Sequence, residues 1–97
     1  MNLEEAKIAL AACRREIDEI DRRLVAMLNE RSRVVERIGE IKSRVKLPVY
    51  EPAREEEVFA NIESANLGPL SRDAVKRLYE RIIDEMRTMQ RARMEGK

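Results

Sequence analysis

The chain has 97 residues, of which 43% are hydrophobic and 40% are charged, and it contains three Gly, three Pro and no Trp. This composition is typical of one small helical domain covering residues 1–97. Twenty Lys and Arg against nineteen Asp and Glu leave a net charge of +1 with interleaved signs, which argues against nucleic acid as a partner. The longest apolar run, residues 8–13, is far too short to cross a membrane and the N-terminus has no signal-peptide pattern, so we expect a soluble, cytoplasmic protein with no membrane partner.

The first predicted helix runs from about Leu3 to Val45 and is stopped before Pro48, because the residue preceding a proline is pushed out of the helical region. Its apolar side chains recur at alternating steps of three and four, the spacing of a helix packed against other helices. We expect Cys13, the single cysteine, to be a buried thiol within this series. The series, called the apolar row below, consists of Leu10, Cys13, Ile17, Ile20, Leu24, Met27, Arg31, Val34, Ile38, Ile41 and Val45.

This helix is too long for one small domain to cover. At 1.5 Å per residue it spans roughly 60 Å, whereas a compact domain of this size has a radius of gyration of about 12 to 13 Å. An intertwined homodimer, in which two long helices pack on each other and on both partners' short helices, is the simplest way to bury its apolar row.

Two shorter helices follow. The second begins at Pro52, a good first-turn residue, and ends near residues 66–68. Ser71 is then predicted as the N-cap of a third helix that runs towards Met94. The apolar side chains at helical spacing are Val58, Phe59 and Ile62 in the second helix and Val75, Leu78, Ile82, Met86 and Met89 in the third. The predicted fold class is therefore all-α, with three helices per chain and a very long N-terminal one.

Arg31 is the most informative residue, because a charge in an apolar row is costly to bury unless an anion accompanies it. Lys42 lies eleven residues later on the same helix face, roughly 16 Å along the axis. Val35 and Ile38 lie between them, so two cationic side chains over an apolar floor form a pocket suited to a small dianion. Arg14 lies roughly 25 Å before Arg31 on a different side of the helix. It cannot reach this pocket in its own chain, but in an antiparallel dimer it could reach the partner's.

The other two helices add further polar groups. Gln90 lies on the same face of the third helix as Ile83 and Met86, and the start of the second helix carries Glu51, Arg54 and Glu55. Taken singly, each could be a solvated cation, a boundary amide or a first-turn charge suited to the helix dipole. Their convergence on a small apolar cavity favours a binding site. The chain has no His, no activated Ser or Cys constellation and no glycine-rich phosphate loop, so neither nucleophilic nor metal chemistry is expected.

Several stretches of the sequence, in this order, resemble the all-helical chorismate mutase family. They are residues 14–21, 28–31, 38–42 and 48–55 together with Gln90, and the resemblance covers nearly the whole chain. It implies a Claisen rearrangement of chorismate to prephenate, on the branch towards phenylalanine and tyrosine, in an intertwined homodimer without a cofactor. It also implies that each site takes Arg31, Lys42, Arg54 and Gln90 from one chain and Arg14 from the other.

A pericyclic rearrangement moves no proton and needs no nucleophile, so positioning and electrostatics are the whole catalytic task. By the resemblance, Arg14 and Arg31 would bind the two substrate carboxylates, which suits the planar guanidinium group. Lys42 and Gln90 would donate hydrogen bonds to the ether oxygen, where negative charge grows as the C–O bond breaks. These four residues are the predicted catalytic set.

By the same resemblance, Glu55 would accept a hydrogen bond from the substrate hydroxyl, with Glu51 nearby and Arg54 orienting the Glu55 carboxylate. The residues predicted to line the pocket are Val35, Ile38, Val58, Ile83 and Met86. Two positions depart from the family pattern, since many relatives have a serine in place of Met86 and an aspartate in place of Glu51. Neither departure removes a cation or a donor to the ether oxygen.

Two alternatives stay open at this point. An isochorismate-pyruvate lyase of the same fold would share the cationic set, but it resembles this chain less over residues 50–55. A non-catalytic dimeric helical adaptor would explain the long apolar row but not Arg31 within it. The sequence carries no signal that identifies a partner enzyme.

Overall fold

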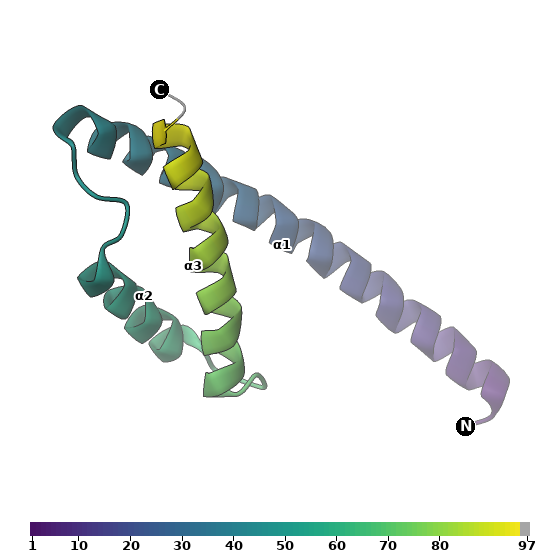
Figure 1. The fold of residues 1–97 in the computed structure, drawn as a ribbon. Coiled ribbons are helices and arrows are strands. Elements are labelled where there is room, and N and C mark those ends of the chain that lie inside the picture. The colour runs from purple at the N-terminus through teal and green to yellow at the C-terminus, as the bar shows by residue number, and fades with distance from the viewer. Residues whose placement is uncertain (96–97) are drawn as a thin grey trace. The chain divides into compact units, whose positions relative to one another are not determined.

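A computed structural model describes residues 1–95, which form three helices and no strand. Helix α1 spans Leu3–Val45, α2 spans Pro52–Ala65 and α3 spans Arg72–Glu95 (Figure 1). The all-helical class predicted from the apolar spacing is confirmed, and the predicted boundaries lie within a few residues of the observed ones. None of the described helices is both long and apolar enough to cross a membrane.

The chain divides into two compact units, Met1–Arg33 and Val34–Lys97, and α1 contributes to both. The first unit begins with an N-cap, since Asn2 Oδ1 accepts a hydrogen bond from the Glu5 N–H at 2.8 Å. The apolar members of the row in this unit are exposed, Ile17 by 54%, and Cys13 is exposed with them, whereas Arg31 is partly buried. The expectation of a buried Cys13 thiol is therefore wrong for the single chain, because the first unit has no second element to cover that helix face.

Helix α1 ends in a hydrogen-bonded reversal of the chain. Lys46 takes a positive φ of 57°, and the Leu47 N–H donates to the Lys42 carbonyl at 2.9 Å. This pairing across a left-handed residue is the Schellman arrangement, which satisfies a carbonyl that the end of a helix would otherwise leave free. The reversal returns the chain towards α2, which starts with Pro52 in its first turn.

Helices α2 and α3 pack on each other and are joined by a short turn (Figure 1). The Asn66 N–H donates to the Ile62 carbonyl at 3.0 Å and closes α2, while Ser71 Oγ accepts a hydrogen bond from the Ala74 N–H at 3.1 Å and caps α3. The predicted N-cap at Ser71 is thus confirmed. An ion pair between Glu63 and Arg72 also joins the two helices beside the turn.

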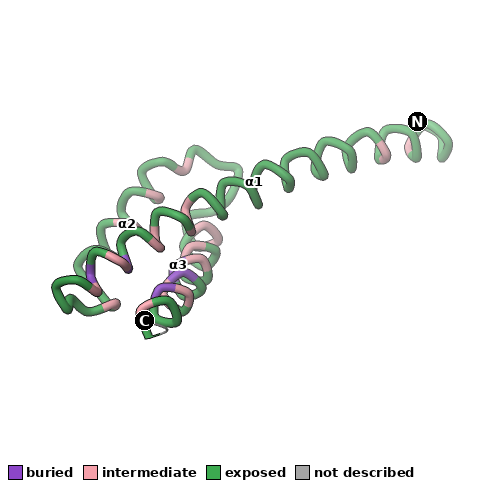
Figure 2. The backbone as a smooth tube through the Cα atoms, turned by 90° about the horizontal axis from the view of Figure 1, so that it is seen from above, coloured by how far each residue is buried: buried purple, intermediate pink, exposed green. Residues whose placement is uncertain are grey.

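The interior of the second unit combines apolar and polar side chains. Ile83 and Met86 of α3 are buried at 9% exposure, while Lys42 and Gln90 are still less exposed at 6%. Gly39 is buried as well. The buried positions lie on α3 and on the C-terminal part of α1 (Figure 2). A cation and an amide buried more deeply than Ile83 and Met86 need an explanation beyond packing.

Candidate active site

Lys42 is the centre of the polar cluster in the second unit. Its Nζ donates to the Val49 carbonyl at 3.0 Å and to Gln90 Oε1 at 3.5 Å, and it forms an ion pair with Glu51 Oε1 at 2.5 Å. An ammonium group has three donors, so these three acceptors account for its hydrogen-bonding capacity. Glu51 is the most accessible of the partners, with a side chain 49% exposed. The ammonium group is therefore buried but balanced by one carboxylate at the edge of the site.

Gln90 links α3 to the C-terminal part of α1. Its Nε2 donates to the Val35 carbonyl at 3.3 Å, while its Oε1 faces Lys42. Gly39 lies at this contact, where a Cβ would lie 3.2 Å from Gln90 Cγ, a tight approach, and 3.8 Å from Met94 Cγ, an ordinary contact. The amide is thus held at both ends, with its oxygen turned towards the ammonium group.

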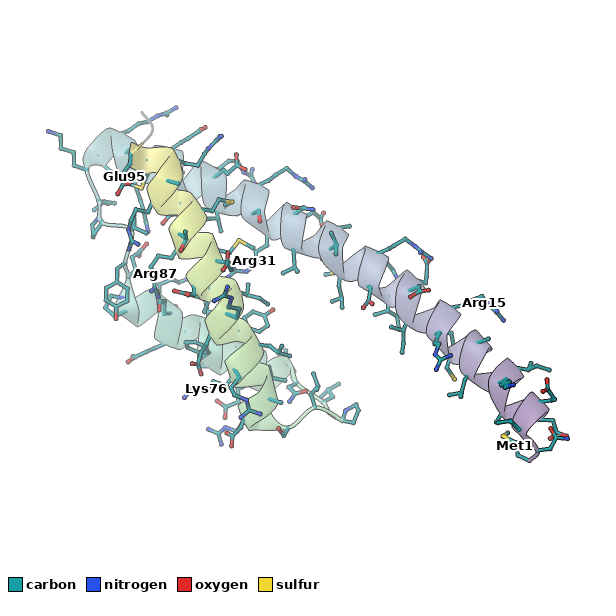
Figure 3. All side chains as sticks on the ribbon, turned by 45° about the vertical axis from the view of Figure 1, so that its right-hand side comes forward. Met1, Arg15, Arg31, Lys76, Arg87 and Glu95 are labelled. Atoms are coloured by element: carbon teal, nitrogen blue, oxygen red, sulfur yellow. The ribbon has the colours of Figure 1, made fainter. Side chains whose placement is uncertain are left out.

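A second charged cluster joins α2 to α3. Arg87 Nη2 donates to both carboxylate oxygens of Glu55, at 2.7 and 2.6 Å, and Arg87 Nη1 lies 3.8 Å from Asp84 Oδ1. The Arg87 guanidinium also lies over the Tyr50 ring, 5.1 Å from its centroid, which is within the range of a cation–π interaction. Figure 3 shows Arg87 reaching from α3 towards the start of α2. The Arg87 and Glu55 side chains are only 27% and 24% exposed.

The connection between α1 and α2 touches both clusters. The Val49 carbonyl and the Glu51 carboxylate contact Lys42, and the ring of Tyr50 between them lies against Arg87. The short segment 49–51 therefore couples the position of the buried ammonium group to the position of the Arg87–Glu55 pair.

The pocket-lining residues predicted from the sequence differ in burial. Ile83 and Met86 are buried, Val35 and Val58 are partly buried, and Ile38 is 40% exposed. The buried pair lies on α3, on the helix that also carries Gln90. The apolar wall that the structure describes is thus formed mainly by α3.

Of the three predicted arginines, only Arg54 lies in the same unit as these clusters. Arg14 and Arg31 lie in the first unit on α1, where Arg14 is exposed. Arg54 is 58% exposed and lies 3.9 Å from Glu57 within α2. The carboxylate of Glu55, which Arg54 was expected to orient, is paired with Arg87 instead.

Sequence reasoning missed Arg87, and a signal for it was present. Arg87 lies four residues after Ile83 and three before Gln90, so it occupies the buried face of α3. This is the argument that singled out Arg31 on α1, applied to a second arginine. The Val49 contact had no comparable signal, because a backbone carbonyl is the same in every residue.

The chemistry available here is electrostatic. The described part of the second unit brings together an ammonium group, a guanidinium group, a carboxamide and two carboxylates beside an apolar wall. Within residues 1–95 no group of three or more His, Cys, Asp or Glu side chains is placed to hold a metal ion. Such a site can bind and orient an anionic molecule and stabilise negative charge that develops on it.

Comparison with known proteins gives a consistent family. The model of chorismate mutase type II matches residues 13–91. A bifunctional chorismate mutase/prephenate dehydratase of Aquifex aeolicus is 41% identical over 78 residues, which is 76% of this chain and 22% of that protein. A chorismate mutase of Methanocaldococcus jannaschii is 34% identical over 53 residues, covering 55% of this chain and 54% of its own.

Solved structures agree with the sequence comparison. A chorismate mutase structure from Thermus thermophilus superposes with a TM-score of 0.84 at 31% identity, covering 86% of this chain and 94% of its own. The chain spans about a fifth of the length of the bifunctional relatives it matches. With the family model covering most of its length, the chain belongs to the type II chorismate mutase family.

Proposed function

We propose that this chain is a chorismate mutase that converts chorismate to prephenate without a cofactor. The observation that carries the proposal is the buried ammonium group of Lys42 beside the Gln90 amide, at 3.5 Å between Nζ and Oε1. Family membership supports the same activity. A buried cation and amide with no nucleophile beside them suit a reaction whose only demand is conformational control and charge stabilisation.

Lys42 is proposed to donate to the ether oxygen of the substrate. That oxygen is a weak acceptor in the bound ground state and a stronger one as the C–O bond breaks, so the hydrogen bond strengthens in the transition state. All three donors of Lys42 are engaged in the described chain, and the contact with half-exposed Glu51 is the one most readily exchanged. Gln90 has a second donor on Nε2 besides the one given to the Val35 carbonyl, and this donor is proposed to reach the same oxygen.

The two carboxylates of the substrate are proposed to be bound by Arg31 and by Arg14 of a second copy of the chain. The proposed assembly is an intertwined homodimer with two shared sites, and both units of each chain act as one domain in it. The exposed apolar side chains of the first unit support this, because a long apolar face is rarely left in water. Arg54 and Glu51 are proposed to line the hydroxyl end of the pocket beside Glu55.

We further propose a cytoplasmic location. Cys13 is the single cysteine of the sequence and forms no disulfide within the described chain, which is usual for proteins of a reducing compartment.

The test is an assay of the purified chain with chorismate and, separately, with isochorismate. Formation of prephenate from chorismate supports the proposal. Release of pyruvate from isochorismate in the absence of prephenate formation would establish the lyase, and no turnover of either compound by the folded protein would favour a non-catalytic helical adaptor.

A further inference from the structure

We propose that Arg87 is a positioning residue, which fixes the Glu55 carboxylate so that this carboxylate can accept the hydroxyl of the substrate. The inference rests on the proposed function and assigns to it a residue that the sequence analysis did not include. Arg87 acts through Glu55 and does not itself contact the reacting atoms.

The geometry of the Arg87–Glu55 pair supports this role. One guanidinium nitrogen, Arg87 Nη2, lies 2.7 and 2.6 Å from the two oxygens of Glu55, so both oxygens are held at a fixed distance and the carboxylate faces the guanidinium group end-on. An ionised carboxylate has about four lone-pair sites. Two remain after the contacts with Arg87, so Glu55 can still accept a hydrogen bond from a ligand.

The Arg87–Glu55 pair is also better shielded from water than the surface ion pairs. Ion pairs such as Arg81–Glu85 lie within one helix turn, with side chains 74% and 60% exposed, and such pairs contribute little. Arg87 and Glu55 instead join two helices and are about three-quarters buried. Because water competes less for a buried pair, its geometry is maintained more strictly.

Arg87 has further contacts besides the one with Glu55. Its guanidinium lies over the Tyr50 ring, and its Nε is buried with no hydrogen-bond partner among the described residues. Asp84 Oδ1 lies 3.8 Å from Arg87 Nη1, on the same helix. The Tyr50 ring and the two carboxylates therefore surround the guanidinium group and hold it towards Glu55.

The experiment measures steady-state kinetics with chorismate for Arg87→Ala, Arg87→Lys, Glu55→Gln and the double variant Glu55→Gln/Arg87→Ala. A hydroxyl contact binds the ground state and the transition state alike, so its loss should raise KM with little change in kcat. We expect Arg87→Ala to raise KM by about tenfold, as for one weakened hydrogen bond to a charged group. Arg87→Lys, which keeps the charge but not the planar group, should restore part of the loss.

The control is Arg81→Ala, which removes an exposed ion pair from the same helix and should leave both constants unchanged. Circular dichroism reports the folding of each variant, and Arg87→Lys preserves the test if Arg87→Ala does not fold. Coupling is the decisive result: Glu55→Gln should change KM much less in the Arg87→Ala background than in the wild type.

An active wild type whose KM is unmoved by Arg87→Ala and Arg87→Lys, or for which the Glu55 and Arg87 effects simply add, would overturn this inference alone. A folded wild type that does not rearrange chorismate would overturn the proposed function and this inference with it.

Discussion

Lys42 carries a charge that is costly to bury but suited to stabilise a negative charge on a ligand. A charge at 6% exposure loses most of its hydration, and the loss is tolerated because a carboxylate, a carbonyl and an amide oxygen surround the ammonium group. A ligand oxygen entering this site would meet a cation already stripped of water. Once that oxygen has replaced the Glu51 carboxylate, the Val49 carbonyl and the Gln90 amide still hold the ammonium group, so little further reorganisation is needed as negative charge develops.

Replacing Lys42 by Ala should lower kcat by at least about 10²-fold, by analogy with the loss of one oxyanion-hole donor, with a smaller effect on KM. Gln90→Ala should act in the same direction but less strongly, because a neutral amide is the weaker donor. Steady-state kinetics with circular dichroism check both variants. Lys76→Ala, at an exposed position of α3, is the control and should be near normal. Near-normal turnover in a folded Lys42→Ala protein would contradict the mechanism.

The sequence predicted which residue types gather at the site better than it predicted their partners. Gln90 and Lys42 were found because each is a polar residue on an apolar helix face. The partner of Glu55 was not found, because Arg54 is its neighbour in sequence while Arg87 reaches it only through the packing of α2 on α3. Ion-pair partners of this kind depend on tertiary geometry, which periodicity alone does not supply.

At the scale of the elements, helix boundaries were predictable because their signals are local. Pro52 marks the start of α2 and Ser71 the cap of α3 in any context. The close contact between α1 and α3 could not be predicted from local signals, since only the structure shows that Gly39 faces Gln90. A glycine inside a helix costs up to about 1 kcal/mol relative to alanine. At Gly39 the absence of a Cβ gives room for the close approach of the two helices, and the Gln90 amide reaches the Val35 carbonyl.

Ser71→Ala should destabilise the protein by about 1 kcal/mol, because the Ala74 N–H loses its side-chain acceptor. Ser64→Ala is the matched control, since Ser64 is an exposed serine in the last turns of α2 and its replacement should be close to neutral. Urea unfolding of the two variants at the same protein concentration gives the comparison. Equal midpoints for both variants would show that the cap contributes nothing to stability.

At the scale of the whole molecule, the main feature is the exposed apolar face of the first unit. Three of its apolar side chains, Leu10, Leu24 and Met27, are each at least half exposed. Burying each would contribute on the order of 1 to 2 kcal/mol, so the row as a whole represents a large driving force for association. The proposed homodimer would cover this apolar face, because in a two-fold symmetric dimer the same face of each copy packs against the other.

A homodimer without an appreciably populated folded monomer should have a melting temperature that rises with protein concentration, because unfolding is then coupled to dissociation. Thermal unfolding followed by circular dichroism over a hundredfold concentration range measures this directly. A compact, folded species of 11.3 kDa in sedimentation at micromolar concentration would contradict the proposed assembly.

Shared sites make a separate prediction about activity. Arg14→Ala and Arg31→Ala homodimers should each be nearly inactive, whereas mixing and re-annealing the two chains should restore activity. The heterodimer has one site with an intact Arg14 from one chain and an intact Arg31 from the other. If heterodimers form, as native mass spectrometry of differently tagged chains would show, and activity stays absent, then Arg14 does not act across the interface.

The way α1 is joined to α2 has a practical consequence for protein engineering. The carbonyl of Lys42 receives the Leu47 N–H, and its ammonium group holds Val49 and Glu51, so both ends of this loop are fastened to one residue. Its length is therefore constrained, and an inserted residue would displace the ammonium group as well as the loop. Inserted tags or domains belong instead in the turn around Gly68, where a Cβ would meet no atom within 4 Å beyond the adjoining residues.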